Sequence, residues 1–357
     1  MITIVVPTYK EAKNIPVLTK ELHRALDSAR MTYSIVVVDD NSNDGTVEAV
    51  SSLKSEYPIQ LLVRKNEKGL SSAVVAGIRL AQGDIIVVMD ADLSHPPVRV
   101  PELVRQISEN HAEFAIGSRF VPGGSAPHFN WFRKLNALVS KIMAFPFVRV
   151  KDPMAGFFAF PRSIMTDIDK LNPLGFKIGL EIMVKCAPKK IIEIPIEFQD
   201  RLYGESKLSI KEQVNYLLHL WRLFNYKYHI IAEMFRFGIV GLLGMVIDLS
   251  CVRIAFGSFD IPFRYSRIIG FVIALTFNFF LNKKFNFKKA KQRNTYLQYG
   301  EFLAVCLAGF SVNWLISVGL FERFAFFNTH YLVASFFGVL GGFVVNFCGS
   351  KFLVFRK

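Results

Sequence analysis

Cysteine is scarce in this sequence, and its placement fits neither a disulfide framework nor a metal site. Four cysteines occur among 357 residues, and no two of them stand in CxxC spacing. That spacing is typical of zinc sites and redox motifs, while small secreted folds carry far more cysteine for their length. We therefore expect neither a disulfide framework nor a zinc site, and the chain is long enough for two domains.

Two further patterns are missing near the N-terminus. No GxGxxG motif follows the first apolar segment, which argues against a dinucleotide-binding fingerprint. A secretory signal peptide is also missing, because the apolar run Ile2–Val6 is too short for its central region and leads directly into Pro7. We therefore expect the N-terminal half to remain in the cytoplasm.

Acidic residues are outnumbered by basic ones. The chain has 29 Asp and Glu against 43 Lys and Arg, which gives a formal net charge of +14. Such a balance suits an anionic partner, either a nucleic acid or an anionic lipid surface. No nucleic-acid-binding motif is present, and the basic residues cluster beside long apolar segments. The charge therefore favours a membrane surface and no nucleic acid.

Long apolar segments dominate residues 233–357, whereas the first 232 residues have the mixed texture of a soluble protein. A membrane-spanning helix needs about 20 apolar residues. Four segments approach that length, at about 235–256, 266–282, 300–321 and 332–350. Buried core helices of a large soluble domain are the alternative, but four such runs with short polar connectors favour four transmembrane helices.

The basic residues around these segments indicate an orientation. The connector Lys283–Arg293 is strongly basic, and the chain ends in Arg356 and Lys357. The other two connectors hold little positive charge beyond Arg264 and Arg323. Because positively charged loops stay on the cytoplasmic side, we expect a multi-pass protein of the cell membrane with both termini and the N-terminal domain in the cytoplasm.

A weak internal repeat predicts two tandem helical hairpins in the apolar part. NFFLNK at 278–283 is echoed by NFCGSK at 346–351. Three residues of one half match three of the other in spacing, namely Phe237, Gly244 and Asp248 with Phe302, Gly309 and Asn313. Charge is costly within a span, so Asp248 and Arg253 either line a path for a lipid headgroup, or pair inside the bundle or lie close to the interface.

Strand-like and helix-like segments alternate through residues 1–210. Short apolar runs rich in β-branched residues occur in ITIVVPTY, SIVVVDD, LLVRK and GDIIVVMDAD. Apolar residues at helical spacing lie between them, as at Ile15, Leu18, Leu22 and Leu26. This alternation predicts an α/β fold with a doubly wound, mostly parallel sheet.

Polar segments follow three of the predicted strands, at Pro7–Glu11, Asp39–Ser42 and Asp90–Ser94. Ligands of doubly wound sheets bind beyond the carboxyl ends of the strands, so these segments should line one crevice. Asp90 and Asp92 are separated by one residue and can face Mg²⁺ or Mn²⁺ together, a cation that is usually held by one or two carboxylates and substrate phosphates. A solvated pair in a turn is the alternative.

The motifs VPTYKE, VVVDDNSNDGT, KGLSSAVVAGI and VVMDADLSHPP resemble those of the family-two inverting glycosyltransferases, which have the GT-A fold. Within that family, MDADLSHPP, GSRF, KDPMAGFFAF and GESKL are similar to the dolichol-phosphate mannose synthases. The likeness covers about residues 1–210. Residues 233–357 resemble the GtrA-like four-helix domain that is fused to some members.

The resemblance implies a nucleotide-sugar donor, commonly GDP-mannose, and a dolichyl or other polyprenyl phosphate acceptor. Carried over by position, the nucleotide-sugar site comprises Pro7, Tyr9, Glu11, Val38, Asp40, Asp90, Ala91, Asp92, Arg201 and Lys207. The metal ligands are Asp90, Asp92 and Ser94, and the catalytic residues are Asp92, Arg119 and Arg133, of which the two arginines hold the acceptor phosphate.

Two positions depart from the family pattern. The family often has Gln where this chain has Ser94, whose hydroxyl is a shorter and weaker ligand for a metal. It usually has Ser where this chain has Ala155, so a hydrogen bond is lost there, although Asp152 and Gly156 remain.

The chemistry of the expected reaction agrees with these residues. A phosphate monoester has a second pKa of about 6, so the acceptor is already ionised and needs no strong base. The metal would stabilise the leaving diphosphate, and the planar fork of arginine suits phosphate. His95 is a candidate base, but a structural residue of the turn is the favoured interpretation.

A lipid acceptor requires a site near the membrane surface. The segments His128–Phe147 and Lys211–His229 mix aromatic, basic and apolar residues, as interfacial amphipathic helices do, and core-facing helices are the alternative. We expect the second segment to form an interfacial helix or linker over 211–232.

Three alternatives stay open or are set aside. A polyprenyl-phosphate glucosyltransferase would use UDP-glucose at the same site, and a lipid-linked sugar carrier or flippase would act through residues 233–357. A processive polysaccharide synthase is disfavoured because QVNYLLHLWR lacks the QxxRW pattern.

Overall fold

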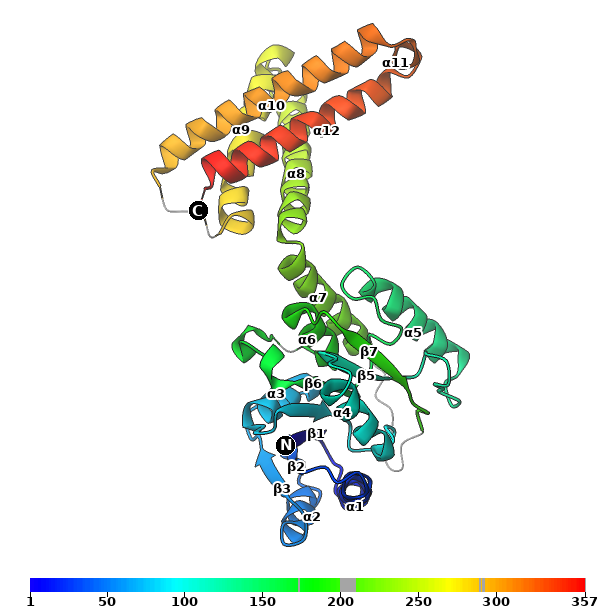
Figure 1. Ribbon diagram of the computed structural model, residues 1–357. Helices are drawn as coiled ribbons and strands as arrows, with labels where there is room; N and C mark the ends of the chain where they lie inside the picture. The colour runs from blue at the N-terminus through cyan, green and yellow to red at the C-terminus, as the bar shows by residue number, and fades with distance from the viewer. Residues whose placement is uncertain (173, 200–209, 289, 291–292, 357) are drawn as a thin grey trace. The chain divides into compact units, whose positions relative to one another are not determined.

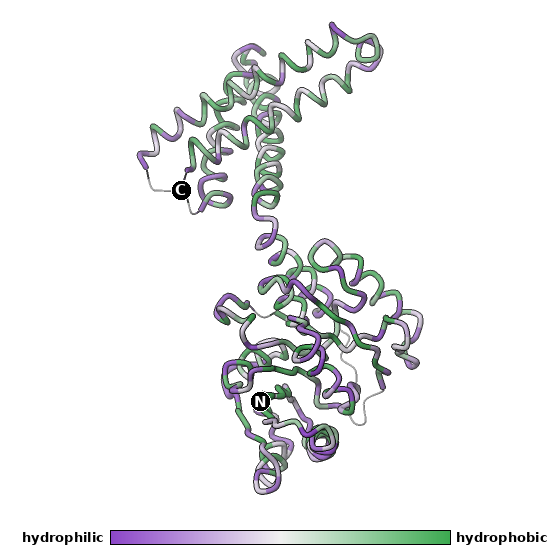
Figure 2. Tube along the Cα trace, viewed as in Figure 1, coloured by the Kyte–Doolittle hydropathy of each residue, from purple (hydrophilic) through white to green (hydrophobic). Residues whose placement is uncertain are grey.

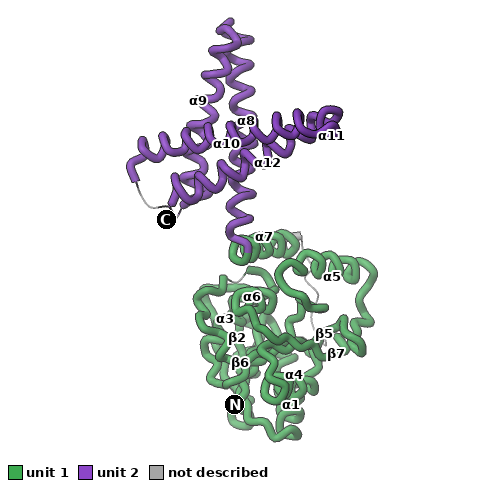
Figure 3. The backbone as a smooth tube through the Cα atoms, turned by 45° about the horizontal axis from the view of Figure 1, so that its top comes forward, with its two compact units in different colours: residues 1–227 green, residues 228–357 purple. Residues whose placement is uncertain are grey.

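The computed structural model describes residues 1–172, 174–199, 210–288, 290 and 293–356. The chain forms two compact units, Met1–Lys227 and Tyr228–Lys357 (Figure 3). Helix α7 (Ile210–Lys227) lies in the first unit and helix α8 (His229–Gly257) in the second. The range 211–232, expected to be an interfacial helix or linker, is thus divided between the two units.

The first unit is built on a seven-stranded sheet in the order β3-β2-β1-β4-β6-β5-β7 (Figure 1). Strand β6 runs antiparallel to β4 and β5, and every other pairing among the described strands is parallel. The strands are β1 (Ile2–Thr8), β2 (Tyr33–Asp39), β3 (Ile59–Val63), β4 (Ile85–Val88), β5 (Phe114–Ser118), β6 (Phe158–Pro161) and β7 (Ile191–Pro195). The predicted mostly parallel α/β sheet is confirmed.

The helices of this unit connect the strands and cover the sheet. They are α1 (Asn14–Ser28), α2 (Thr46–Leu53), α3 (Leu70–Leu80), α4 (Val100–Ser108), α5 (Trp131–Ala144) and α6 (Ile178–Cys186), followed by α7. The apolar stripe of α1 predicted from helical spacing is fully buried, with Ile15, Leu18, Leu22 and Leu26 at most 1% exposed. Burial of such side chains from helices and strands forms a large cluster that includes Val37 and a separate, smaller one that includes Val36 and Val38.

The register of the parallel strands determines where the polar segments lie. Thr8 at the end of β1 pairs with Asp39 at the end of β2, and Val5 pairs with Val88, the last residue of β4. The backbone N–H of Met89 also donates to the carbonyl of Val5. The segments that follow these three strands therefore leave the sheet at the same edge.

The second unit consists of long apolar helices. Four of them are long and apolar enough to cross a membrane, namely His229–Gly257, Phe263–Asn286, Thr295–Arg323 and Tyr331–Val354. These are α8, α9 (Phe263–Leu281) with a π-helical turn at Asn282–Asn286, α10 (Thr295–Arg323), and α12 (Tyr331–Gly349) with a π-helical turn at Ser350–Val354; the short α11 (Ala325–Thr329) precedes α12. Each predicted span lies within one of these helices, whose residues are mostly hydrophobic (Figure 2).

The predicted internal repeat corresponds to two hairpins, in which α8 packs against α9 and α10 against α12. In each hairpin a glycine of the first helix faces an asparagine of the second: Gly244 faces Asn278, and Gly309 faces Asn346. Asp248 accepts a hydrogen bond from Arg267 of α9 at 2.8 Å. This contact fits pairing inside the bundle, one of the alternatives expected for Asp248.

A close helix–helix approach in the second hairpin predicts a sensitive glycine. A Cβ at Gly342 would lie 2.7 Å from the carbonyl oxygen of Gly309, which is backbone and cannot rotate away. We expect Gly342→Ala to destabilise the detergent-solubilised protein by about 1–3 kcal/mol, the usual cost of overpacking.

The control for this measurement is Gly319→Ala in α10, where a Cβ would meet nothing within 4 Å. It should leave the unfolding temperature unchanged or raise it, because Ala favours a helix by about 1 kcal/mol over Gly. Equal effects of the two substitutions would contradict the close packing of α10 and α12.

Candidate functional site

The two predicted metal-binding carboxylates lie in a tight turn directly after β4. Ser94 donates to Asp92 Oδ1 twice, from its backbone N–H at 3.1 Å and from its hydroxyl at 2.6 Å. The turn requires a positive φ of 62° at Leu93, a conformation that a bulky side chain seldom adopts. Asp92 and Ser94 are buried, whereas the side chain of Asp90 is 32% exposed. The turn thus presents one carboxylate to solvent and holds the other in place.

The buried ring of His95 holds this turn in place. Its ring stacks on Phe157 and meets Phe198 edge-on, and its Nδ1 accepts the backbone N–H of Asp90 at 3.3 Å. Burial lowers the pKa of His95 below its usual value, and this outweighs the nearby carboxylates of Asp90 and Asp92, which act in the opposite direction. A neutral imidazole that accepts at Nδ1 carries its proton on Nε2, so the interpretation of His95 as a structural residue fits these contacts.

The segment 152–156 passes close to the same turn. A Cβ at Gly156 would lie 3.3 Å from Asp90 Oδ2 and from His95 Cε1, so a side chain there would press on both. Helix α6 in turn packs on this segment, since a Cβ at Gly179 would lie 3.4 Å from the carbonyl oxygen of Ala155. The segment therefore fixes one side of the Asp90 carboxylate.

Arg119 is held rigidly at the end of β5. Its Nε and Nη2 each donate to Asp152 at 2.8 Å, and its backbone N–H donates to the same carboxylate. Asp152 is 1% exposed, and its own N–H and that of Lys151 donate to Glu193 of β7. The guanidinium of Arg119 is thereby fixed in orientation and partly neutralised.

Arg133 is brought to the same place by the start of α5. Asn130 caps this helix by accepting the backbone N–H of Arg133 at 2.9 Å. The guanidinium carbons of Arg119 and Arg133 lie 5.6 Å and 5.8 Å from the centroid of the Phe129 ring. The two arginines, predicted to act together on the acceptor phosphate, thus share one aromatic neighbour.

The predicted nucleoside residues lie at the ends of β1 and β2. Pro7 and Val38 are buried and face each other in the register of the two strands. Tyr9 is 39% exposed, with the ammonium groups of Lys10 and Lys68 lying 5.6 Å and 5.7 Å from its ring centroid. Ala91 is buried in the turn after β4.

The remaining members of that set differ in how they are held. Glu11 accepts from the side chain of Asn14 at 2.5 Å, at the start of α1. Asp40 is buried and bound by Arg64, which lies one residue beyond β3. Arg201 and Lys207 fall outside the described residues.

Two residues at this edge were missed by the sequence reasoning. Lys177, which precedes α6, is partly buried, and its pKa is lowered to about 8 by loss of hydration and then by the positive charge of Arg119, against the pull of Asp152, Asp90 and Glu212. Arg64 is the second. Neither belongs to a motif whose chemistry is evident from spacing, although Arg64 stands shortly before the KGLSS segment.

The donor set at the carboxylate turn fits a hard cation. Within the described ranges, no three His, Cys, Asp or Glu side chains converge into a metal cluster of their own. Asp90, Asp92 and Ser94 supply oxygen donors, the type that Mg²⁺ and Mn²⁺ prefer, and a cation bound by so few protein ligands keeps positions for water and substrate phosphate. Because Asp90 is partly exposed, a cation would have access to it from the solvent side.

An apolar surface lies on the first unit beside the arginines. Seven large apolar residues on α5 and its end are 45–75% exposed, namely Trp131, Phe132, Leu135, Leu138, Val139, Ile142 and Phe145. Helix α7 packs against α5, with Tyr216 donating to the carbonyl of Ser140 at 2.8 Å, and exposes Val214, Leu217, Leu218 and Trp221. We call these eleven residues the α5–α7 surface. A solvated helix does not normally present so large an apolar face.

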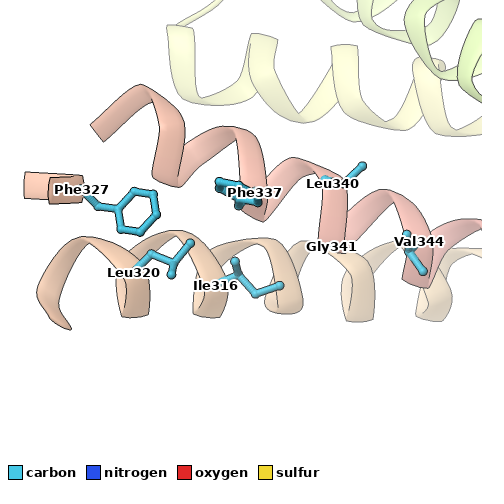
Figure 4. Close-up of a pocket in the computed structure, with 7 residues that line it drawn as sticks. All are labelled: Ile316, Leu320, Phe327, Phe337, Leu340, Gly341 and Val344. Atoms are coloured by element: carbon cyan, nitrogen blue, oxygen red, sulfur yellow. The ribbon is translucent and has the colours of Figure 1, made fainter. Parts of the chain in front are cut away.

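The second unit has a groove of a different kind. A cavity of about 500 Å³ lies between α10, α11 and α12, lined by residues that include Ile316, Leu320, Phe337 and Leu340 (Figure 4). All the lining side chains shown are apolar, so this groove offers no group for acid–base, metal or phosphate chemistry. The candidate site is therefore the polar edge of the sheet in the first unit.

Comparison with known proteins matches both parts of the chain. Residues 3–168 match the family model of glycosyl transferase family 2, and residues 236–355 match the GtrA/DPMS transmembrane domain. A dolichol-phosphate mannosyltransferase from Pyrococcus furiosus is 37% identical over 350 residues, which cover 97% of each chain.

Two fungal relatives of the same name are similar to the first part of the chain. The dolichol-phosphate mannosyltransferase from Saccharomyces cerevisiae is 39% identical over 63% of this chain and 88% of its own, and that from Mycosarcoma maydis is 36% identical over 69% and 86%. The chain is therefore a membrane-embedded glycosyltransferase that belongs to the dolichol-phosphate mannosyltransferase family.

Proposed function

We propose that this enzyme transfers mannose from GDP-mannose to dolichyl or another polyprenyl phosphate, with inversion at the sugar. The observation that carries the proposal is that the carboxylate turn and the Arg119–Asp152 ion pair lie close together at one edge of the sheet. The carboxylate turn of Asp90 and Asp92 lies beside the segment 152–156, and Asp152 of that segment holds Arg119. Family membership and the names of the three relatives support mannosyl transfer to dolichol phosphate.

The donor diphosphate would meet the carboxylate turn through Mg²⁺ or Mn²⁺. Asp90, Asp92 and Ser94 would hold the cation, which when bound neutralises the charge that develops on the departing diphosphate. Ser94 also orients Asp92, since its hydroxyl donates to Oδ1. Tyr9, Glu11 and Asp40 would bind the nucleoside beyond the ends of β1 and β2.

The acceptor phosphate would be held by Arg119 and Arg133. The ion pair with Asp152 uses Nε and Nη2 of Arg119 and does not use Nη1. Because the ion pair fixes the guanidinium in one orientation, its Nη1 is suited to donate to a phosphate oxygen. A phosphate oxygen then attacks C1 of the mannose, the new C–O bond forms, and GDP leaves with the electron pair of the broken bond. Because the acceptor oxygen is already ionised, no residue has to remove a proton from it.

The α5–α7 surface would place this site at the membrane. Its apolar residues suit insertion among lipid headgroups, while Arg133, Lys134 and Lys141 on α5 suit anionic phosphates. A lipid phosphate held at the bilayer would then reach the arginines without leaving the membrane. With the basic connector Lys283–Arg293 on the cytoplasmic side, the catalytic unit and both termini are cytoplasmic.

The two alternatives differ in what supports them. A UDP-glucose donor would use the same carboxylate turn, so only the nucleoside and sugar contacts distinguish it. A carrier function in the second unit has less support, because the charged Asp248 is paired with Arg267 and the groove of α10 and α12 is apolar. The second unit then serves as an anchor.

The proposal is tested by sugar transfer with the purified full chain in detergent. Labelled GDP-mannose or UDP-glucose is offered with a polyprenyl phosphate, with and without Mg²⁺ or Mn²⁺. Metal-dependent labelling of the lipid from GDP-mannose is expected. Labelling from UDP-glucose alone would change the donor, and no labelling from a broad donor panel would refute the proposal.

Asp92→Asn should nearly abolish turnover in this assay. A neutral amide is a poorer ligand for Mg²⁺ than a carboxylate, and Asn also changes the hydrogen bonds that Ser94 makes to Oδ1. The matched control is Asp167→Asn, an exposed carboxylate in another loop, which should retain full activity. Wild-type turnover by the Asp92 variant would remove the metal role of the turn.

The lowered pKa of Lys177 predicts that the transfer rate falls at alkaline pH. Its pKa of about 8 means that the ammonium loses its charge as the pH rises through 8, and an uncharged amine no longer attracts phosphate. We expect the transfer rate to fall across that range and Lys177→Arg to shift the fall to higher pH, because a guanidinium keeps its charge. Lys189→Arg, at an exposed position, serves as the control. The same alkaline limb in the Lys177 variant would contradict this role.

The α5–α7 surface predicts a dependence on how the acceptor is presented. Ile142, at 62% exposure, becomes a charge in Ile142→Asp, which opposes insertion into lipid. The rate with acceptor embedded in vesicles should fall several-fold, while the rate with a short, water-soluble polyprenyl phosphate should not change. Val98→Asp, at an equally exposed apolar position outside α5 and α7, should alter neither rate. Equal loss with both acceptors would indicate damage to the site instead.

A further inference from the structure

Asp40 is surrounded by donors from the chain itself. Its Oδ1 accepts from Arg64 Nε at 2.8 Å and from Arg64 Nη2 at 2.5 Å. Its Oδ2 accepts the backbone N–H of Gly69 at 2.7 Å. The side chains of Asp40 and Arg64 are 7% and 6% exposed, so this ion pair is almost shielded from water.

Arg64 is itself fully engaged by the segment that leads into α3. Its Nη1 donates to Ser72 at 2.9 Å and to Glu67 at 3.1 Å, and its Nη2 also donates to the carbonyl of Gly69 at 3.0 Å. Each nitrogen of the guanidinium therefore has a partner. This fixes Asp40 to the loop of residues 64–72, and the same loop places Lys68 beside Tyr9.

The hydrogen bonds limit what Asp40 can still accept. A carboxylate offers about four acceptor positions, two on each oxygen. Arg64 uses both positions on Oδ1, and Gly69 uses one on Oδ2. One position on Oδ2 is left. Asp39, the neighbouring carboxylate, is 0% exposed and accepts from Thr8 and Ser42, so Asp40 is the member of the pair with any access to a ligand.

We propose that Arg64 and the Gly69 N–H restrict Asp40 to a single hydrogen bond from the nucleoside of the donor, so that Asp40 recognises one donor hydrogen and not a pair. This inference rests on the proposed function and deepens it. Guanine presents N1–H and the 2-amino group side by side, and a carboxylate can bind both only if each oxygen has a free acceptor position. With Oδ1 saturated, Asp40 binds one of them.

We therefore expect the enzyme to tolerate the loss of any nucleoside donor that Asp40 does not bind, which recognition through a pair of hydrogen bonds would not allow. A buried polar group left without its partner costs a binding site about 1–3 kcal/mol, which is a factor of roughly 5 to 150. Only the group that donates to Asp40 leaves the carboxylate unpaired when it is removed, whether that group is N1–H, the 2-amino group or a ribose hydroxyl. Removal of a group that does not donate to Asp40 leaves its hydrogen bond intact.

The experiment is nucleotide binding to the full chain in detergent with Mg²⁺, measured by calorimetry. The ligands are GDP, UDP, IDP (which lacks the 2-amino group), N1-methyl-GDP and 2′-deoxy-GDP. One of the three guanine-nucleotide analogues should bind about tenfold more weakly than GDP, and the other two should bind within about threefold of it. The analogue that binds weakly identifies the 2-amino group, N1–H or the ribose hydroxyl as the source of the hydrogen.

The outcomes separate this inference from the proposed function. A tenfold loss with both IDP and N1-methyl-GDP would show that Asp40 binds the pair of base donors, which would overturn the single-acceptor inference and leave the mannose transfer intact. Full affinity for all three analogues would overturn the inference as well, because Asp40 would then not contact the nucleoside. Failure of GDP itself to bind, with UDP bound instead, would overturn the proposed donor.

A pair of variants tests the positioning role of Arg64. Arg64→Lys keeps the positive charge but cannot reach Asp40, Gly69 and Ser72 together, so the KM for GDP-mannose should rise about tenfold while the KM for the lipid acceptor is unchanged. Arg24→Lys makes the same replacement at an exposed ion pair on α1 and should alter neither value. Equal rises in both KM values, or no rise, would assign Arg64 a structural role alone.

Discussion

The parallel pairing of β1 with β2 and β4 is the constraint on which the functional site depends. Hydrogen bonding of three parallel strands in this register brings Thr8, Asp39 and Val88 to one edge of the sheet. The polar segments that follow then have no alternative but to meet there. A slip of one residue in any of these strands would turn its buried side chains to the opposite face, so the hydrophobic core that fixes the register also fixes the site.

Charged groups around that edge are arranged in pairs that are costly to bury and costly to break. Arg119 with Asp152 and Arg64 with Asp40 each join a residue at one strand end to a loop that is distant in sequence. Buried ion pairs contribute little net stability, but removal of one partner leaves an unpaired charge. Their value here is geometric, because each pair holds a guanidinium or carboxylate in one orientation before any phosphate arrives.

The two units of the chain differ in where their apolar side chains lie. In the first unit, the apolar stripe of α1 from Ile15 to Leu26 is buried, whereas most apolar residues of α5 remain exposed beside Arg133. In the second unit, outward-facing apolar residues cover every long helix, and glycine allows close approach where Gly309 meets Asn346 and Gly342 meets the backbone of α10. Membrane association of helices depends on such close packing, because lipid supplies no hydrophobic drive between them.

Much of the architecture followed from the sequence because it rests on local, periodic patterns. The alternation of apolar runs with helical stripes such as Ile15 to Leu26 predicted the mostly parallel sheet, and four long apolar segments predicted the spans. Motif spacing alone also placed Asp90 and Asp92 at a strand end. Contacts between segments that are separated in the sequence could not be predicted in this way. That Asp152 holds Arg119 and that Arg64 saturates Oδ1 of Asp40 depend on segments 33 and 24 residues apart meeting in space. That Phe129 contacts both Arg119 and Arg133 depends on the path of the loop between β5 and α5. Periodicity carries no information on such meetings, so the tertiary structure decided them, and with them how many hydrogen bonds each charged group has left for a substrate.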